Sequence, residues 1–376
     1  MKKTTATTTL VRTAGKRKLR VGVIGGGHLG TIHARLLRSI DDVELVGVVD
    51  PVAAARQRIA AEQHAAVFEH HRQLLGQIDA AIVAVPTCHH YWIGMELAEA
   101  RVHLFVEKPL ATATAEADAL IRATTARNLV LQVGHVERFN PAFTAATAQV
   151  ARPRYIEAVR ASGFTGRATD VGVVLDLMIH DIDLVLQLAG CDVVDVQAIG
   201  GAVFGPHEDM AQARLEFASG CVANLSAART SFQPQREMRL FAADAFVGID
   251  FTQSSLRIVR PSARVRARDI DVQNLSAEER QRLQENLFTE FLPLEEIRVE
   301  KRNAILDEQH DFVISIRSGQ SPQVTGQHGR AALAVAETIL DKIAQRQRLF
   351  QRAAHLPGPH WSLAGDRPPL PARRAG

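Results

Sequence analysis

Short apolar runs alternate with amphipathic segments of helical length over residues 19–141. This alternation is typical of a parallel sheet whose strands are joined by crossover helices. We predict strands at residues 19–24, 43–50, 80–85, 103–106 and 129–133, with helices between them at residues 28–39, 51–63, 89–100 and 114–127.

The pattern changes after Pro141, where single polar and apolar positions alternate. A strand at 154–161 leads to a helix at 175–188. Runs at 193–199, 211–217, 222–228, 236–241 and 246–251 then follow without helices between them, which predicts an antiparallel sheet with one covered face. A capping box that starts at Ser276 predicts a helix to about residue 287, and further helices are expected at 305–317 and 330–345.

The length of 376 residues exceeds the roughly 250–300 at which one hydrophobic core stops growing, so two domains are expected. The predicted fold class is α/β, with an N-terminal doubly wound parallel sheet over residues 19–137. An α+β domain with an open antiparallel sheet follows over residues 138–350, as a substrate and oligomerisation domain. Residues 1–18 and 351–376 are predicted to be disordered tails.

Positive charge is concentrated at the two ends of the chain. Residues 1–20 carry seven Lys and Arg without an acid, and residues 355–376 carry +2, so with a total of +3 the body carries about −6. This distribution argues against nucleic-acid binding, which would predict that deleting residues 1–17 abolishes function. No apolar stretch nears the roughly 20 residues of a membrane span, so we expect a cytoplasmic protein without a membrane partner, with a transit peptide as the alternative.

The cysteines Cys88, Cys191 and Cys221 are odd in number, far apart and without a paired metal spacing. We predict that all three are reduced and structural, without a disulfide. No zinc site or other metal site is expected.

A glycine motif follows the first predicted strand and opens the first helix. Gly25, Gly27 and Gly30 form the pattern G-x-G-x-x-G, which permits a tight turn, close approach of a pyrophosphate and close packing of helix on strand. The helix N-terminus adds free amides for an anion. We therefore predict a Rossmann dinucleotide site, with His28 and Leu29 among the cofactor contacts.

Asp50 ends the second predicted strand, 20 residues beyond Gly30. A carboxylate there accepts hydrogen bonds from the adenosine ribose and repels a 2′-phosphate, which favours NAD over NADP. The alternative is a helix N-cap, because Asp50 precedes Pro51.

Two further groups follow the fourth and fifth predicted strands, where doubly wound sheets bind their ligands. Pro86, Thr87 and His90 follow the fourth strand, and Glu107 with Lys108 ends the fifth. We expect these five residues to contact the cofactor. Lys108 is expected to reach a substrate hydroxyl. The alternative is a surface salt bridge with Glu107.

Asp176, His180 and Asp183 have spacings of four and three, which places them on one helix face. Alcohol oxidation needs a base for the hydroxyl proton, and histidine suits that task near neutral pH. A carboxylate one turn away can orient the imidazole. The alternative is a structural ion pair.

Together these motifs resemble the glucose–fructose oxidoreductase / inositol dehydrogenase / MocA (Gfo/Idh/MocA) family over residues 19–345. The resemblance implies a Rossmann domain followed by an open sheet that often packs against a second subunit, hence a homo-oligomer. It implies Lys108, Asp176 and His180 as the catalytic group, with His180 as acid/base. The family often has Gly where this chain has Met178, which leaves the fit of the substrate pocket open.

Residues 134–141 and 176–183 resemble members that oxidise nucleotide-linked amino sugars. The expected substrate is UDP-N-acetylglucosamine, oxidised at the C3 hydroxyl. Arg138 or Arg167 could then hold the pyrophosphate by bidentate hydrogen bonds, unless each pairs with a nearby acid. A free sugar or inositol is the alternative substrate, and a catalytically idle dinucleotide or sugar sensor the alternative class, although a sensor needs no proton acceptor.

Overall fold

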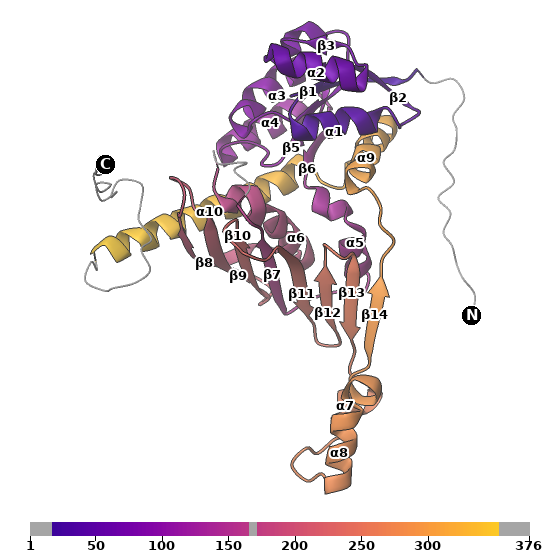
Figure 1. Ribbon diagram of the computed structural model, residues 1–376, viewed down its shortest axis with the longest axis vertical. Coiled ribbons are helices and arrows are strands. Elements are labelled where there is room, and N and C mark those ends of the chain that lie inside the picture. The colour runs from indigo at the N-terminus through magenta and orange to yellow at the C-terminus, as the bar shows by residue number, and fades with distance from the viewer. Residues whose placement is uncertain (1–16, 165–170, 353–376) are drawn as a thin grey trace, which may run out of the picture.

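The computed structural model describes residues 17–164 and 171–352. These residues form two sheets, one above the other in Figure 1. Most of both predicted tails lies outside the described residues. Arg17, inside the predicted N-terminal tail, donates a hydrogen bond to Asp79 at 2.9 Å.

The first sheet confirms the predicted doubly wound architecture. Its six strands are all parallel, in the order β3-β2-β1-β4-β5-β6. The central strand β1 lies between β2 and β4, so the chain reverses its winding direction there, which is where such sheets bind ligands. The strands are β1 (Leu19–Ile24), β2 (Val43–Val49), β3 (Val67–Phe68), β4 (Ala80–Val83), β5 (His103–Glu107) and β6 (Leu131–Gly134).

Four helices connect these strands and lie close to the predicted positions. The two-residue strand β3 was not predicted, because it is too short to produce a periodic pattern. The helices are α1 (His28–Leu37), α2 (Ala53–Gln63), α3 (His90–Glu99) and α4 (Thr114–Thr125).

The second sheet has eight strands in the order β14-β13-β12-β11-β7-β10-β9-β8. It is antiparallel except between β7 and β10, which run parallel. The parallel pair arises because a helix returns the chain after β7, and the last strand of the β8–β9–β10 meander then lies beside β7. The strands are β7 (Tyr155–Ala161), β8 (Val193–Gly201), β9 (Met210–Phe217), β10 (Val222–Ala228), β11 (Gln235–Phe241), β12 (Phe246–Asp250), β13 (Ser255–Val259) and β14 (Leu294–Arg298).

One face of this sheet is covered and the other is open, as predicted. Helices α6 (Ile179–Ala189) and α10 (Gly326–Arg352) pack on the covered face, and burial alternates along β7 and β10. The short helix α5 (Pro141–Thr147) joins the same core. Helices α7 (Ala263–Arg266) and α8 (Ala277–Glu285) form an arm that projects away from the sheet (Figure 1), and Ser276 forms the predicted capping box.

Helix α9 (Ala304–Ser318) returns from the second sheet to the first. Phe312 packs against Phe105 of β5, with ring centroids 5.8 Å apart. Arg317 makes a two-pronged ion pair with Asp42, whose shorter contact is 2.8 Å. A late segment of the chain therefore completes the first core, and the division of the chain at residue 137 stays a prediction.

We expect Phe312→Ala to lower the free energy of unfolding by about 3–5 kcal/mol, because it leaves a cavity against the first sheet. Phe312 is 1% exposed, whereas Ile314 on the same helix is 54% exposed. Ile314→Ala is the matched control and should change stability by less than about 0.5 kcal/mol. Urea denaturation measures both variants, and equal losses would contradict the packing described for α9.

Candidate active site

The glycine loop has the shape that a dinucleotide pyrophosphate needs. Gly25 has φ +104°, and a Cβ there would lie 2.3 Å from the carbonyl oxygen of Ala84. A Cβ on Gly30 would lie 1.8 Å from the carbonyl oxygen of Gly25, whereas one on Gly27 would enter open space. Helix α1 begins without a side-chain cap, so its first amides are free to bind an anion. His28 and Leu29 are exposed beside this opening.

Asp50 lies beside the same loop, at the end of β2. Its carboxylate oxygens accept hydrogen bonds from the backbone amides of Gly26 (2.9 Å) and Val52 (2.8 Å). The N-cap of α2 is Val52, so Asp50 is not the cap residue itself. Arg58 was not predicted: its guanidinium donates to the carbonyl oxygen of Gly26 at 2.8 Å, which places a cation beside the loop.

His90 holds two loops of the site together. Its ring nitrogens lie 2.8 Å from the carbonyl oxygen of Pro109 and 2.9 Å from that of Val85. The ring is buried, and burial lowers its pKa. This geometry does not fit the expected cofactor contact, because the ring has no free polar atom. Pro86 is exposed and Thr87 half-buried, so these two remain accessible.

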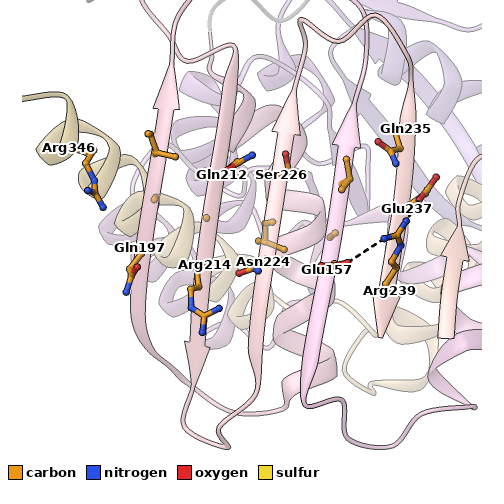
Figure 2. A pocket seen from close by; sticks show the side chains of 16 residues that line it. Glu157, Gln197, Gln212, Arg214, Asn224, Ser226, Gln235, Glu237, Arg239 and Arg346 are labelled. Carbon is orange, nitrogen blue, oxygen red and sulfur yellow. Dashed lines mark ion pairs between the residues drawn. The ribbon is translucent and has the colours of Figure 1, made fainter. Parts of the chain in front are cut away.

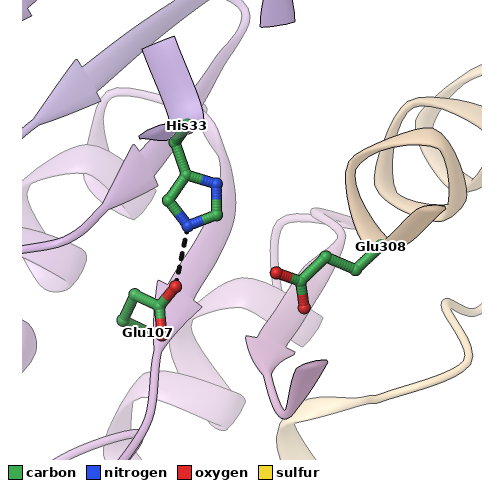
Figure 3. Close-up of side chains that lie close together, drawn as sticks. All are labelled: His33, Glu107 and Glu308. Atoms are coloured by element: carbon green, nitrogen blue, oxygen red, sulfur yellow. Dashed lines mark hydrogen bonds and ion pairs between the residues drawn. The ribbon is translucent and has the colours of Figure 1, made fainter. Parts of the chain in front are cut away.

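Glu107 is anchored from behind by a histidine that the sequence analysis missed. Its carboxylate lies 2.7 Å from Nε2 of His33 on α1 (Figure 3). Burial opposes ionisation of Glu107, but the hydrogen bond and charge of His33, with the charge of Lys108, keep its pKa below the ordinary value. Its carboxylate also accepts a hydrogen bond from the backbone amide of Lys108 at 3.3 Å, so Glu107 is a buried support for Lys108. The sequence did offer a signal for His33, because it lies about one helical turn after Gly30, the last glycine of the motif.

Glu308 of α9 points toward the same pair (Figure 3). Its pKa is raised well above the ordinary value by burial and then by the charges of Glu107 and Asp311, so it is a neutral acid. Ligand atoms of His33, Glu107 and Glu308 lie within 4.8 Å of one another, close enough to hold a metal ion. Both nitrogens of His33 are already in hydrogen bonds, the second with Gln309 at 2.8 Å, so we assign no metal.

Lys108 joins the two halves of the site. Its Nζ donates to the carbonyl oxygen of Asp176 at 2.7 Å and approaches the Asp176 carboxylate at 3.3 Å. The expected alternative, a surface salt bridge with Glu107, does not form, because Nζ points away toward Asp176. An ammonium has three donors, so one remains for a substrate.

His180 has an imidazole that stays neutral. Its pKa is lowered well below the ordinary value by burial and then by the charges of Lys108 and Arg160. Nδ1 is enclosed and has no hydrogen-bond partner among the described residues, whereas Nε2 is not enclosed. Among those residues Asp176 binds Lys108 and not the imidazole, so the expected carboxylate–histidine pair is absent. Residues Val174–Met178 form a π-helical turn, which changes the side-chain directions that α-helical spacing predicts.

Asp183 faces away from the site and pairs with Arg138. The guanidinium donates to both carboxylate oxygens at 2.7 and 2.8 Å, and both side chains are buried. This pairing corrects the expected role of Arg138: its guanidinium is already engaged by Asp183, as the alternative predicted. Arg167 lies outside the described residues.

A second buried ion pair lies under the helix that carries His180. Arg160 donates to both carboxylate oxygens of Asp181, at 3.1 and 2.8 Å, and to Glu137 at 2.8 Å. His135, directly after β6, is also buried, and neither ring nitrogen has a partner among the described residues. The signal for His135 was its place at the carboxyl end of a predicted strand. Arg160 gave no such signal, because it reads as one polar position of an alternating strand.

The chain matches two family models. One is described as an oxidoreductase family with an NAD-binding Rossmann fold and matches residues 19–135. The other, the GFO/IDH/MocA C-terminal domain, matches residues 142–246.

Several known proteins are similar along most of their length. A UDP-N-acetylglucosamine 3-dehydrogenase of Acidithiobacillus ferrooxidans is 36% identical over 319 residues, which are 85% of this chain and 95% of that protein. Its solved structure superposes with a TM-score of 0.77 at 34% identity, over 88% of this chain and 99% of that one. A myo-inositol 2-dehydrogenase of Thermotoga maritima is 25% identical over 84% of this chain and 93% of that protein.

A levoglucosan dehydrogenase solved with NADH has a TM-score of 0.73 at 16% identity, over 88% of this chain and 98% of that one, which shows the fold alone. Within residues 17–164 and 171–352, no helix is long and apolar enough to cross a membrane.

We expect Arg138→Met to lower the free energy of unfolding by about 3–5 kcal/mol, because it leaves the Asp183 carboxylate buried and unpaired. The double variant Arg138→Met/Asp183→Leu should recover most of that loss, since both charges are then removed. Chemical denaturation measures the pair. Unchanged stability together with a raised KM for a sugar nucleotide would contradict the structural role and show that Arg138 binds the substrate.

Proposed function

The chain belongs to the Gfo/Idh/MocA oxidoreductase family, and we propose that it oxidises a secondary hydroxyl of a sugar nucleotide with NAD. The observation that carries this proposal is the contact of Lys108 with Asp176 near a neutral His180, at the carboxyl edge of the sheet that also holds the glycine loop. The preferred substrate is UDP-N-acetylglucosamine, oxidised at C3.

His180 acts as the base in this proposal. A neutral imidazole accepts a proton, and Nε2 is the nitrogen that a substrate can reach. Lys108 donates its remaining N–H to the hydroxyl oxygen and stabilises the negative charge that develops there as the proton leaves. Asp176 holds Lys108 in place through two contacts. When bound, NAD supplies the hydride acceptor of the reaction.

The residues of the glycine loop fit a dinucleotide. Gly25, Gly27 and the free amides of α1 would hold the pyrophosphate, and Asp50 at the end of β2 would hold the adenosine ribose. We favour NAD over NADP because the Asp50 carboxylate repels a 2′-phosphate. The Arg58 guanidinium beside the loop would instead attract a 2′-phosphate. The preference for NAD therefore depends on Asp50, and not Arg58, facing the adenosine ribose.

The substrate assignment rests on similarity. A UDP-N-acetylglucosamine 3-dehydrogenase shares more sequence with this chain than the myo-inositol 2-dehydrogenase does, at 36% against 25% identity. An inositol or free sugar therefore stays the second candidate. The catalytically idle sensor is disfavoured, because a sensor needs no neutral base beside an ammonium.

The open face of the second sheet supports a homo-oligomer (Figure 2). Outward positions of five neighbouring strands line a shallow hollow of about 690 Å³. They carry both charges, such as Arg239 with Glu157 at 3.6 Å, so the surface can pair with a copy of itself. The three cysteines are free, which fits the expected cytoplasmic location.

We expect His180→Ala to lower turnover by about two to four orders of magnitude while NAD binding persists. In the unmodified protein the acidic limb of kcat/KM should have its midpoint below pH 6.5, because the pKa of His180 is lowered from the ordinary value of 6.5 and the base stays neutral further into the acid range. Near-normal turnover in the variant would remove His180 from the mechanism.

We expect Asp50→Ala to weaken the binding of NAD by about ten- to a hundredfold, since hydrogen bonds to a charged group are worth about 1.5–3 kcal/mol. The variant should also discriminate less strongly against NADP. Asp50→Asn is the matched variant that removes only the charge. The ratio of kcat/KM for the two cofactors measures the effect. An unchanged ratio in both variants would leave Asp50 as a support of the glycine loop.

A further inference from the structure

Three loops meet at one end of the second sheet. Strands β7, β8 and β10 run in the same direction, so their carboxyl ends lie together. We call the surface formed by Phe164, Phe204, Phe232 and Arg236 at this end the sheet rim. Each phenylalanine follows one of these three strands, and Arg236 lies at the start of β11.

The sheet rim is continuous with the catalytic segment. The backbone carbonyl of Glu208 accepts a hydrogen bond from the amide of Val173, and its carboxylate accepts one from Val174, both at 3.0 Å. Arg229 donates to the carbonyl oxygen of Val171 at 2.9 Å. The loops after β8 and β10 therefore hold the entry to the π-helical turn that carries Asp176. A substrate bound at His180 and longer than one sugar can extend onto the rim.

Large aromatic rings are exposed there. Phe164 is 45%, Phe204 59% and Phe232 94% exposed. The ring centroids of Phe164 and Phe204 lie 4.5 Å apart, so the two rings form one platform. The strands that precede them, β7 and β8, are not neighbours in the sheet. Exposed apolar groups gathered in this way mark a binding surface. A flat aromatic base is a suitable occupant, because base–aromatic stacking is worth about 1–3 kcal/mol.

Arg236 supplies an exposed cation at the same end of the sheet. Strand alternation puts it on the face opposite to Gln235 and Glu237, which line the open face in Figure 2. It lies in register with Arg160 on β7, but Arg160 is buried and paired whereas Arg236 is exposed. Its side chain has no ion pair with any residue in the described part of the chain. Its positive charge is among the causes that lower the pKa of His180, so it lies within electrostatic reach of the proposed base.

We propose that the sheet rim binds the nucleoside diphosphate half of the substrate, with Arg236 at the diphosphate and the Phe164–Phe204 platform against the base. This inference rests on the proposed function, since it assigns a place to the part of a sugar nucleotide that does not react. A guanidinium matches phosphate oxygens with two parallel hydrogen bonds. The rim takes over the role once expected of Arg138, whose guanidinium is committed to Asp183.

The test is calorimetric titration of the full-length protein with UDP and with uridine, which separates phosphate from base contacts without catalysis. Arg236→Gln should weaken the binding of UDP by about ten- to a hundredfold, as expected for lost hydrogen bonds to a charged group. The affinity for uridine should stay within twofold of that of the unmodified protein. Arg236→Lys should restore part of the affinity. Phe204→Ala should weaken both probes by about five- to a hundredfold. The control is Arg257→Gln, an exposed arginine of the same sheet, and it should change neither.

The outcomes separate this inference from the proposed function. If Arg236→Gln binds UDP like the unmodified protein, while that protein oxidises UDP-N-acetylglucosamine, the rim is not the diphosphate site and the proposed function stands. If the unmodified protein neither binds UDP nor oxidises UDP-N-acetylglucosamine, both fail. If Phe204→Ala binds both probes normally but changes the sedimentation of the protein, the platform is a subunit contact and the assignment of the base is wrong.

Discussion

The contact between Lys108 and Asp176 is the interaction on which the site depends. Lys108 directly follows β5 of the first sheet, and Asp176 belongs to the π-helical turn that precedes α6 on the covered face of the second sheet. The Lys108 ammonium therefore links the first sheet, which holds the glycine loop, to the segment that carries the proposed base His180. The Glu107 carboxylate accepts a hydrogen bond from the backbone amide of Lys108 and lies 2.7 Å from Nε2 of His33. Gln309 of α9 in turn holds Nδ1 of His33, so helices from both ends of the chain support this carboxylate.

The surroundings of His180 explain why a histidine can serve as base there. Packing shields part of the ring, including Nδ1, and the nearby cations oppose its protonation. Arg160, one of these cations, is buried but paired with Glu137 and Asp181, which offsets the cost of burying its charge. The charges that act most strongly on the imidazole, those of Lys108, Arg160, His135 and Arg236, all lower its pKa. Burial of the ring and the cations beside it therefore keep the proposed base neutral.

Sequence patterns predicted the first sheet closely because its strands are buried on both faces and its crossover helices are amphipathic. They also placed the glycine loop and Lys108 after predicted strands and His180 on a predicted helix, which agrees with the elements of the structure. The patterns missed β3, β13 and β14, and they missed the parallel pairing of β7 with β10. Pairing partners are chosen by contacts between distant segments, which local periodicity does not contain.

The sequence by itself determined the family, the order of elements and the types of chemical group at the strand ends, because each depends on residues that are neighbours along the chain. The tertiary structure decided which of these groups meet. It paired Asp176 with Lys108 and Asp183 with Arg138, and it placed His33 and Glu308 close to the Glu107 carboxylate. It also left Arg236 exposed while burying Arg160 beside it. Burial and pairing decide whether a charged side chain supports the fold or faces a ligand, and both are properties of the packed molecule.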